Sequence, residues 1–234
     1  MANKSQAGIH NDHLEQAQTR LMKGRSYKDL STICIIPTRG IVSVRVLQSW
    51  MNLMHPMNQR FVRMFVEGDE VGEAYNNAIE AILADKTLST WKYILTLEED
   101  NAPPPDGLLK LYENMDKYSV IGGLYWTKGE GGQPMIYGDV KEMPKTFVPQ
   151  LPKTDTVQEC NGLGMGFNLF RLDMFKKLER PWFKSLQEYE PGKGARSYTQ
   201  DLYFYERAAM SGHRFACDTR VLVGHWDEQN KTMW

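Results

Sequence analysis

The sequence predicts an α/β protein with a central, mostly parallel sheet, in which a regular first half precedes a mixed second half. Two observations predict this class. Up to about Tyr118, short continuous apolar runs alternate with segments whose apolar residues recur every three or four positions, which indicates buried strands connected by helices. Beyond that point short strand-like segments dominate and only two helices are indicated. A doubly wound α/β half followed by a mixed half is the expected result.

In the first half, three apolar runs predict parallel strands, and each is followed by a helix. The strands are expected over residues 32–37, 61–66 and 91–97. Helices with one apolar face are expected over residues 44–54, 74–83 and 103–112, and the last of these opens with three prolines, which favour the first turn of a helix.

The second half combines predicted strands over residues 119–126, 134–137 and 157–161 with helices over 172–178 and 199–210. The segment 187–197 is rich in Gly, Pro and charged residues and is expected to be a mobile loop. Residues 1–30 are polar and without sustained periodicity, so they are expected to form a mobile arm. The remainder, 31–234, is expected to form a single domain whose halves meet near residue 118.

Composition excludes several classes of protein. The chain has 234 residues with 28 Lys and Arg against 29 Asp and Glu, so it is not a nucleic-acid binder that acts through bulk positive charge. No apolar run approaches the roughly 18 residues of a membrane span, and no hydrophobic signal peptide is seen, so a cytoplasmic protein without a transmembrane segment is expected. Three widely spaced cysteines favour reduced, buried thiols over a disulfide framework.

The strongest chemical signal is the acidic turn Glu98-Glu99-Asp100, which directly follows the apolar run ending at Leu97. Open α/β sheets bind ligands beyond the carboxyl ends of their strands. Clustered carboxylates repel each other unless a cation lies among them, and Mg²⁺ or Mn²⁺ prefers such oxygen ligands. The alternative interpretation is a solvated acidic turn that complements the N-terminus of the next helix.

Four further segments occur in the order that is typical of one enzyme family. They are Pro37-Thr38-Arg39 after the first strand, the small-residue segment 161–171 with Gly162 and Gly164, the segment Thr199-Gln200-Asp201 at a helix start, and the terminal strand 221–225 with His225. Together with the acidic turn, they resemble nucleotide-sugar-dependent glycosyltransferases of the GT-A fold, whose Asp-x-Asp motif carries the metal and nucleotide. The resemblance covers residues 32 to about 226. Glu98 stands in place of the usual first aspartate.

The resemblance implies a Rossmann-like nucleotide-binding half, an acceptor-side half and a role for each motif. Asp201 is expected to be the catalytic carboxylate. Asp100, His225 and Glu98 are expected to hold Mn²⁺ or Mg²⁺. Contacts with a nucleotide-diphosphate sugar, the donor substrate, are expected from Pro37, Thr38, Arg39, Asn76, Glu98, Glu99, Gly162 and Gly164.

Each of these roles has a structural alternative. Asp201 in a first helical turn complements the helix dipole, and a lone histidine such as His225 is commonly a structural residue. A Mg²⁺-dependent nucleotidyltransferase and a catalytically silent nucleotide-sugar-binding module therefore stay open. The acceptor is a hydroxyl group of unknown class, on a glycan, a protein, a small molecule or a modified nucleobase in DNA, and the choice between inversion and retention is also open.

Overall fold

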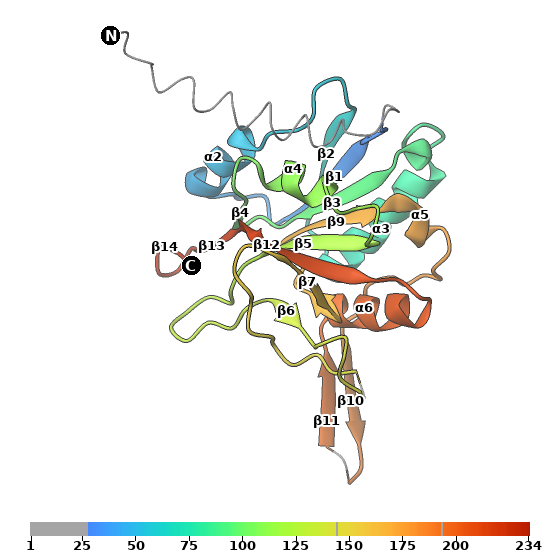
Figure 1. Cartoon of the computed structure of the whole chain (residues 1–234), viewed down its shortest axis with the longest axis vertical. Coiled ribbons are helices and arrows are strands. Elements are labelled where there is room, and N and C mark those ends of the chain that lie inside the picture. The colour runs from blue at the N-terminus through green and yellow to red at the C-terminus, as the bar shows by residue number, and fades with distance from the viewer. Residues whose placement is uncertain (1–27, 144, 193) are drawn as a thin grey trace.

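The computed structural model describes residues 28–143, 145–192 and 194–234, so nearly all of the expected N-terminal arm lies outside the described residues. Its centre is a seven-stranded sheet with the strand order β2-β1-β3-β9-β5-β12-β7 (Figure 1). Five of these seven strands run in one direction, and β9 and β7 run against them. The predicted mostly parallel α/β sheet is confirmed.

The first half follows the predicted alternation. Strand β1 (Thr32–Thr38) pairs in parallel with β2 (Phe61–Glu67) on one side and with β3 (Tyr93–Leu97) on the other. The connections are helix α2 (Val44–Asn52) and helix α3 (Val71–Ala84), with the single turn η1 (Leu88–Thr90) before β3. The Glu70 carboxylate caps α3 by accepting hydrogen bonds from the backbone N–H groups of Gly72 and Glu73, which satisfies donors that the first helical turn leaves unpaired.

The second half extends the same sheet with crossed connections. Strand β9 (Phe167–Arg171) lies antiparallel between β3 and β5 (Val120–Leu124). Strand β12 (Phe215–Leu222) is parallel to β5, and β7 (Val157–Cys160) closes the edge. This order places the carboxyl ends of β1, β3, β5 and β12 along one edge of the sheet.

Helices cover both faces of the sheet and create two cores. One core joins Trp50 of α2 and Leu108 of α4 (Gly107–Tyr112) to Leu95 of β3. The other joins Ile79 of α3 and Phe204 of α6 (Gln200–Met210) to Ile94 of the same strand, and the short helix α5 (Leu172–Phe175) contributes to it. Because both faces are covered, the strands read as continuous apolar runs.

Three smaller sheets attach to the central one. The three-stranded sheet of β4 (Asn101–Ala102), β13 (Gly224–Asp227) and β14 (Thr232–Met233) lies next to the acidic turn. Strands β6 (Ile136–Tyr137) and β8 (Gly162–Leu163) pair with each other in a second small antiparallel sheet. The predicted strand over 134–137 contains β6, whereas β4, β8 and β14 have two residues each and are too short for periodicity to show.

The expected mobile loop over 187–197 is instead an antiparallel hairpin, which is a correction. Strands β10 (Leu186–Glu190) and β11 (Gly194–Tyr198) pair from Leu186↔Tyr198 to Glu190↔Gly194 and project away from the sheet (Figure 1). Gly192 and Gly194 have φ values of 83° and 96°, a region that glycine adopts without strain. The glycines that suggested a loop therefore allow the reversal of a hairpin.

Two observations on the described residues concern the class of the protein. Cys34, Cys160 and Cys217 are buried free thiols. Within the described ranges, no helix has the length and apolar character needed to cross a membrane.

Candidate functional site

The site residues lie where four parallel strands end at the same edge of the sheet. Thr38 ends β1 and Arg39 follows it, and the acidic turn Glu98-Glu99-Asp100 follows β3. Lys128 lies four residues beyond β5, and His225 lies just beyond β12. The edge at the carboxyl ends of parallel strands is where open α/β sheets bind ligands.

Glu99 ties the first two strand ends together. Its carboxylate accepts hydrogen bonds from the Thr38 hydroxyl at 2.9 Å and from the Arg39 backbone N–H at 2.8 Å, and it also pairs with the Arg39 guanidinium. The Glu99 side chain is 12% exposed and that of Arg39 is 83% exposed. Glu99 therefore holds the loop after β1 in place, while Arg39 extends into solvent at the edge of the site.

Backbone pairing brings Asp100 and His225 together from positions that are far apart in the sequence. Strand β13 pairs antiparallel with β4 so that His225 lies opposite Asn101. The Trp226 N–H donates to the Asp100 carbonyl at 2.7 Å. As a result, His225 Nε2 lies 3.5 Å from Asp100 Oδ2. The predicted proximity of the acidic turn and the C-terminal histidine is confirmed.

The other ring nitrogen of His225 fixes the orientation of the imidazole. Nδ1 lies 2.8 Å from the Trp126 carbonyl oxygen, which only accepts, so Nδ1 carries the proton. The rings of Tyr125 and His225 pack edge to face, with centroids 5.3 Å apart. Nε2 therefore faces the Asp100 carboxylate: it donates to that carboxylate when the ring is protonated, and it offers a lone pair to a cation when the ring is neutral. Two acceptors that face each other favour a cation between them, and a histidine anchored through its other nitrogen is typical of metal ligands.

Asp100 also has a partner that the sequence interpretation did not include. The Lys128 ammonium donates to Asp100 Oδ2 at 2.5 Å. Burial alone would raise the pKa of Asp100, but the hydrogen bonds and charges of His225 and Lys128 outweigh it and lower that pKa to about 2. Asp100 is therefore a permanent anion at neutral pH, as a cation ligand must be.

Glu98 is in the opposite electrostatic state. It keeps some accessible surface, yet burial, followed by the charges of Asp100 and Asp201, raises its pKa to about 8. The raised pKa means that the charged form of Glu98 is disfavoured until a cation approaches. Glu98 is thus close enough to both carboxylates to interact with them, which links the acidic turn to the start of α6.

Asp201 lies in the first turn of α6 and is 6% exposed. Burial raises its pKa, against hydrogen bonds from Thr199 and the Leu202 N–H, the latter at 2.9 Å. Burial, followed by the charge of Asp201, raises the pKa of Tyr137 on β6, so Asp201 interacts electrostatically with Tyr137 as well as with Glu98. A buried carboxylate with a raised pKa is suited to accept a proton.

Several predicted ligand contacts have internal partners instead. Asn76 is completely buried, and its amide bonds to the backbone of Trp182 and Phe183, so it anchors that loop. Pro37 is buried within β1. The geometry supports no ligand contact through either side chain.

Internal packing leaves little room for a side chain at the two predicted sugar-facing glycines. A Cβ on Gly164 would lie 2.3 Å from the Tyr125 hydroxyl, and one on Gly162 would lie 3.1 Å from the Phe147 ring. Their small size is therefore explained by side chains of the same chain. A contact of these glycines with a donor sugar stays a prediction.

The donor set fits a divalent cation in part. Asp100 and His225 supply one oxygen and one nitrogen ligand of the right chemistry. Among the residues that the structure describes, however, no cluster of three or more His, Cys, Asp and Glu side chains is arranged to hold a metal. An ion bound here would complete its coordination with substrate oxygens and water, as Mg²⁺ commonly does.

Sequence reasoning missed Lys128 and the Trp126 carbonyl. Both lie in or next to the glycine-rich segment 127–132, which connects the predicted strands over 119–126 and 134–137 and was given no role. The signal that was available is its position, since it follows a strand parallel to β1 and β3 and so ends at the ligand-binding edge.

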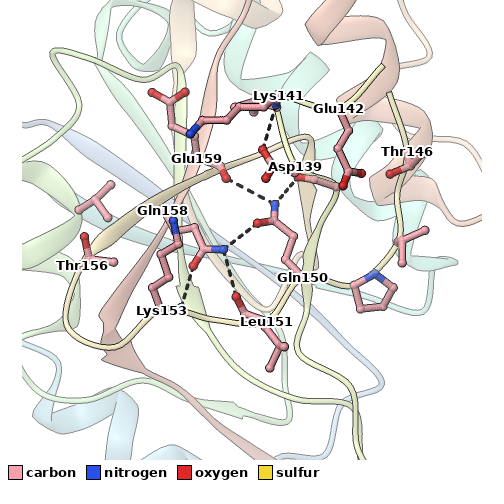
Figure 2. Close-up of a pocket in the computed structure, with 15 residues that line it drawn as sticks. Asp139, Lys141, Glu142, Thr146, Gln150, Leu151, Lys153, Thr156, Gln158 and Glu159 are labelled. Carbon is pink, nitrogen blue, oxygen red and sulfur yellow. Dashed lines mark hydrogen bonds between the residues drawn. The ribbon is translucent and has the colours of Figure 1, made fainter. Parts of the chain in front are cut away.

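A polar hollow of about 520 Å³ lies elsewhere, between residues 138–151 and strand β7 (Figure 2). Its polar side chains bond to one another. The Gln158 amide donates to Gln150 Oε1 at 2.7 Å and accepts from the Lys153 N–H at 2.8 Å, and the Gln150 amide bonds to backbone carbonyls. None of the predicted site residues lines this hollow.

Comparison with known proteins supports the fold. No family model and no curated protein matches the chain. Among solved structures, A197 from STIV has a TM-score of 0.61 at 18% identity, with 87% of this chain and 92% of A197 covered. TarS of S. aureus in complex with UDP-GlcNAc has a TM-score of 0.48 at 11% identity, covering 82% of this chain and 58% of that one.

A putative UDP-N-acetylglucosamine pyrophosphorylase from Entamoeba histolytica has a TM-score of 0.43 at 11% identity, covering 92% of this chain and 78% of that one. The scores of TarS and of the pyrophosphorylase are too low to carry an argument, so the shared fold rests on A197. At this identity the likeness concerns the fold alone.

Proposed function

We propose that this chain is a glycosyltransferase that moves a sugar from a nucleotide-diphosphate sugar to a hydroxyl group. One observation carries the proposal. His225 Nε2 lies 3.5 Å from Asp100 Oδ2 at the carboxyl edge of the sheet, and Glu98 interacts electrostatically with both Asp100 and the buried carboxylate Asp201 of α6. Such an edge offers a counter-charge for a leaving diphosphate and a proton acceptor for an incoming hydroxyl.

The diphosphate is expected next to Asp100 and His225. Mn²⁺ or Mg²⁺ held by these two residues would, when bound, neutralise the negative charge that develops on the departing diphosphate. Arg39 is exposed at the neighbouring strand end, where its fork of donors suits phosphate or nucleobase oxygens. Thr38 and Glu99 hold the loop that presents it.

The transfer step assigns Asp201 a defined role. In an inverting reaction the acceptor oxygen bonds to the anomeric carbon, the bond to the diphosphate breaks, and its electron pair leaves with the diphosphate. Asp201 takes the proton of the attacking hydroxyl, which its raised pKa favours. In a retaining reaction Asp201 would instead stabilise positive charge on the sugar and orient the acceptor.

A thermal-shift screen tests the proposal. The purified chain is heated with UDP-, GDP-, ADP- and TDP-linked sugars, each with Mn²⁺ and with EDTA. A ligand that binds the native state raises the melting temperature, and we expect one nucleotide class to do so with Mn²⁺. The absence of a shift with every nucleotide sugar at millimolar concentration would contradict the proposal.

Product analysis separates the reaction classes. A glycosyltransferase releases the nucleoside diphosphate from the donor, with water serving as a slow acceptor. A nucleotidyltransferase would instead produce or consume pyrophosphate, and a silent binding module would show the thermal shift without turnover.

A further inference from the structure

We propose that Lys128 is a resident counter-ion of Asp100, which weakens binding of a divalent cation until a nucleotide diphosphate draws the ammonium away. The inference deepens the proposed function and rests on it for the identity of the diphosphate. It makes cation binding at this site dependent on the nucleotide.

The first argument is competition for one oxygen atom. Lys128 Nζ lies 2.5 Å from Asp100 Oδ2, and His225 Nε2 lies 3.5 Å from the same atom. A cation coordinated by both Asp100 and His225 would use the carboxylate that Lys128 already neutralises. An ammonium and a divalent cation that contact the same carboxylate repel each other strongly. Binding of the ion therefore requires the Lys128 ammonium to move away from Asp100.

The second argument is that one segment positions both His225 and Lys128. The Trp126 carbonyl fixes the imidazole of His225, and Lys128 follows two residues later. Their segment is a tight turn in which the Thr127 N–H donates to the Gln133 carbonyl and the Gln133 N–H to the Thr127 hydroxyl, at 2.9 and 2.8 Å. The backbone beside Lys128 is therefore fixed, whereas its four-carbon side chain is free to turn about its own bonds.

The third argument concerns what can draw Lys128 away. Lys128 pairs with Asp100 and also interacts electrostatically with Glu98. The Lys128 side chain is 33% exposed, so its ammonium can also reach a ligand in the site. A diphosphate carries several anionic oxygens and is a strong partner for an ammonium group, so its arrival replaces the contact that Asp100 supplies.

Reciprocity then defines the observable. If a diphosphate strengthens cation binding, the cation strengthens diphosphate binding by the same factor. In this chain part of that factor comes from Lys128, because its charge opposes the ion before the nucleotide binds and pairs with the nucleotide afterwards.

The test measures Mn²⁺ binding by the electron paramagnetic resonance signal of free Mn²⁺, with and without UDP. It compares the intact chain with Lys128→Met, which keeps the length of the side chain and removes its charge, and with Lys128→Arg, which keeps the charge. Lys117→Met is the matched control, because Lys117 is exposed near the amino end of β5, away from the site edge. Circular dichroism and melting temperature check that each variant folds.

In the absence of UDP, we expect Lys128→Met to bind Mn²⁺ at least tenfold more tightly than the intact chain, while the Arg and control variants stay within twofold of it. With UDP, the enhancement of Mn²⁺ binding seen in the intact chain should shrink in Lys128→Met.

Equal or weaker Mn²⁺ binding by folded Lys128→Met would overturn the inference. The measurement without UDP does not involve the donor, so it tests the role of Lys128 independently of the proposed function. Failure of the proposed function would appear in the nucleotide-sugar screen instead.

Discussion

Two polar regions of this chain differ in how their polar side chains are satisfied. In the hollow between residues 138–151 and β7, Gln150 and Gln158 bond to each other and to nearby backbone groups. At the carboxyl edge of the sheet, Glu98 and Asp201 are instead held with raised pKa values. The charged form of Asp100 at this edge is stabilised by two partners, His225 and Lys128.

The difference indicates where binding free energy is available. A polar network whose members satisfy one another stabilises the fold and gains little from a ligand. Buried carboxylates that repel each other are costly in the free protein and become favourable when a cation or a proton donor arrives. A hollow of suitable volume is therefore a weaker indicator of function here than the electrostatic state of the sheet edge.

The largest expected effect is at Asp201. Replacing Asp201 with Asn removes the proton acceptor but keeps the size of the side chain. We expect donor turnover to fall by roughly 10²–10⁴-fold, the usual contribution of general-base catalysis, while the affinity for the donor changes little. Nucleoside diphosphate release and calorimetric binding measure the two quantities. A variant that turns over as fast as the intact chain removes Asp201 from catalysis.

The next effect is at Asp100. In Asp100→Ala, His225 loses its co-ligand and Lys128 loses its partner. We expect Mn²⁺ to lose its influence on UDP affinity, while UDP affinity in EDTA is not reduced because the ammonium is free to meet the diphosphate. Isothermal titration with and without Mn²⁺ measures this difference. A Mn²⁺ effect as large as in the intact chain would place the cation elsewhere.

A third effect concerns pH and Glu98. In the folded chain, burial followed by the charges of Asp100 and Asp201 raises the pKa of Glu98 from its ordinary value of 4.5 to about 8. The stability that the Glu98 proton contributes is complete below pH 4.5 and is lost as the pH rises to about 8. Glu98→Gln, measured without divalent ions, should therefore melt at least about 3 °C above the intact chain at pH 9.

At pH 4.5 the two melting temperatures should nearly coincide. The same offset at both pH values would show that the stabilisation does not come from titration of Glu98.

The smallest effect on function is expected in the hollow. Gln158→Ala removes hydrogen bonds to Gln150, the Leu151 carbonyl and the Lys153 N–H. We expect a loss of about 1–3 kcal/mol in the free energy of unfolding with donor affinity unchanged, from urea denaturation and titration respectively. Weakened donor binding in the folded variant would extend the binding site into this hollow and break the contrast between the two regions.

The sequence was most informative where structure is locally encoded. The apolar runs that became β1 and β3 and the helical spacing of α3 need only neighbouring residues, and they were predicted closely. The hairpin from Leu186 to Tyr198 was missed because its glycines were read as flexibility rather than as positions that allow a reversal.

The site shows the same division between local and long-range information. Asp100 and His225 were proposed as ligands from motif order, and the acidic turn was singled out by its place after an apolar strand. Lys128 was not found, because its contact with Asp100 depends on the position of β5 in the sheet and on the turn that follows it. Nor did the pattern show that Asn76 binds the backbone of Trp182 and Phe183, since that role depends on contacts between distant segments.

A crystal structure with Mn²⁺ and UDP, recorded with anomalous scattering at the manganese edge, tests the central claim most directly. The account predicts one manganese peak between Asp100 Oδ2 and His225 Nε2, a diphosphate oxygen on the ion, and the Lys128 ammonium moved from Asp100 to the diphosphate. UDP bound elsewhere on the chain, or bound at this edge with no ion beside Asp100 and His225, would contradict it.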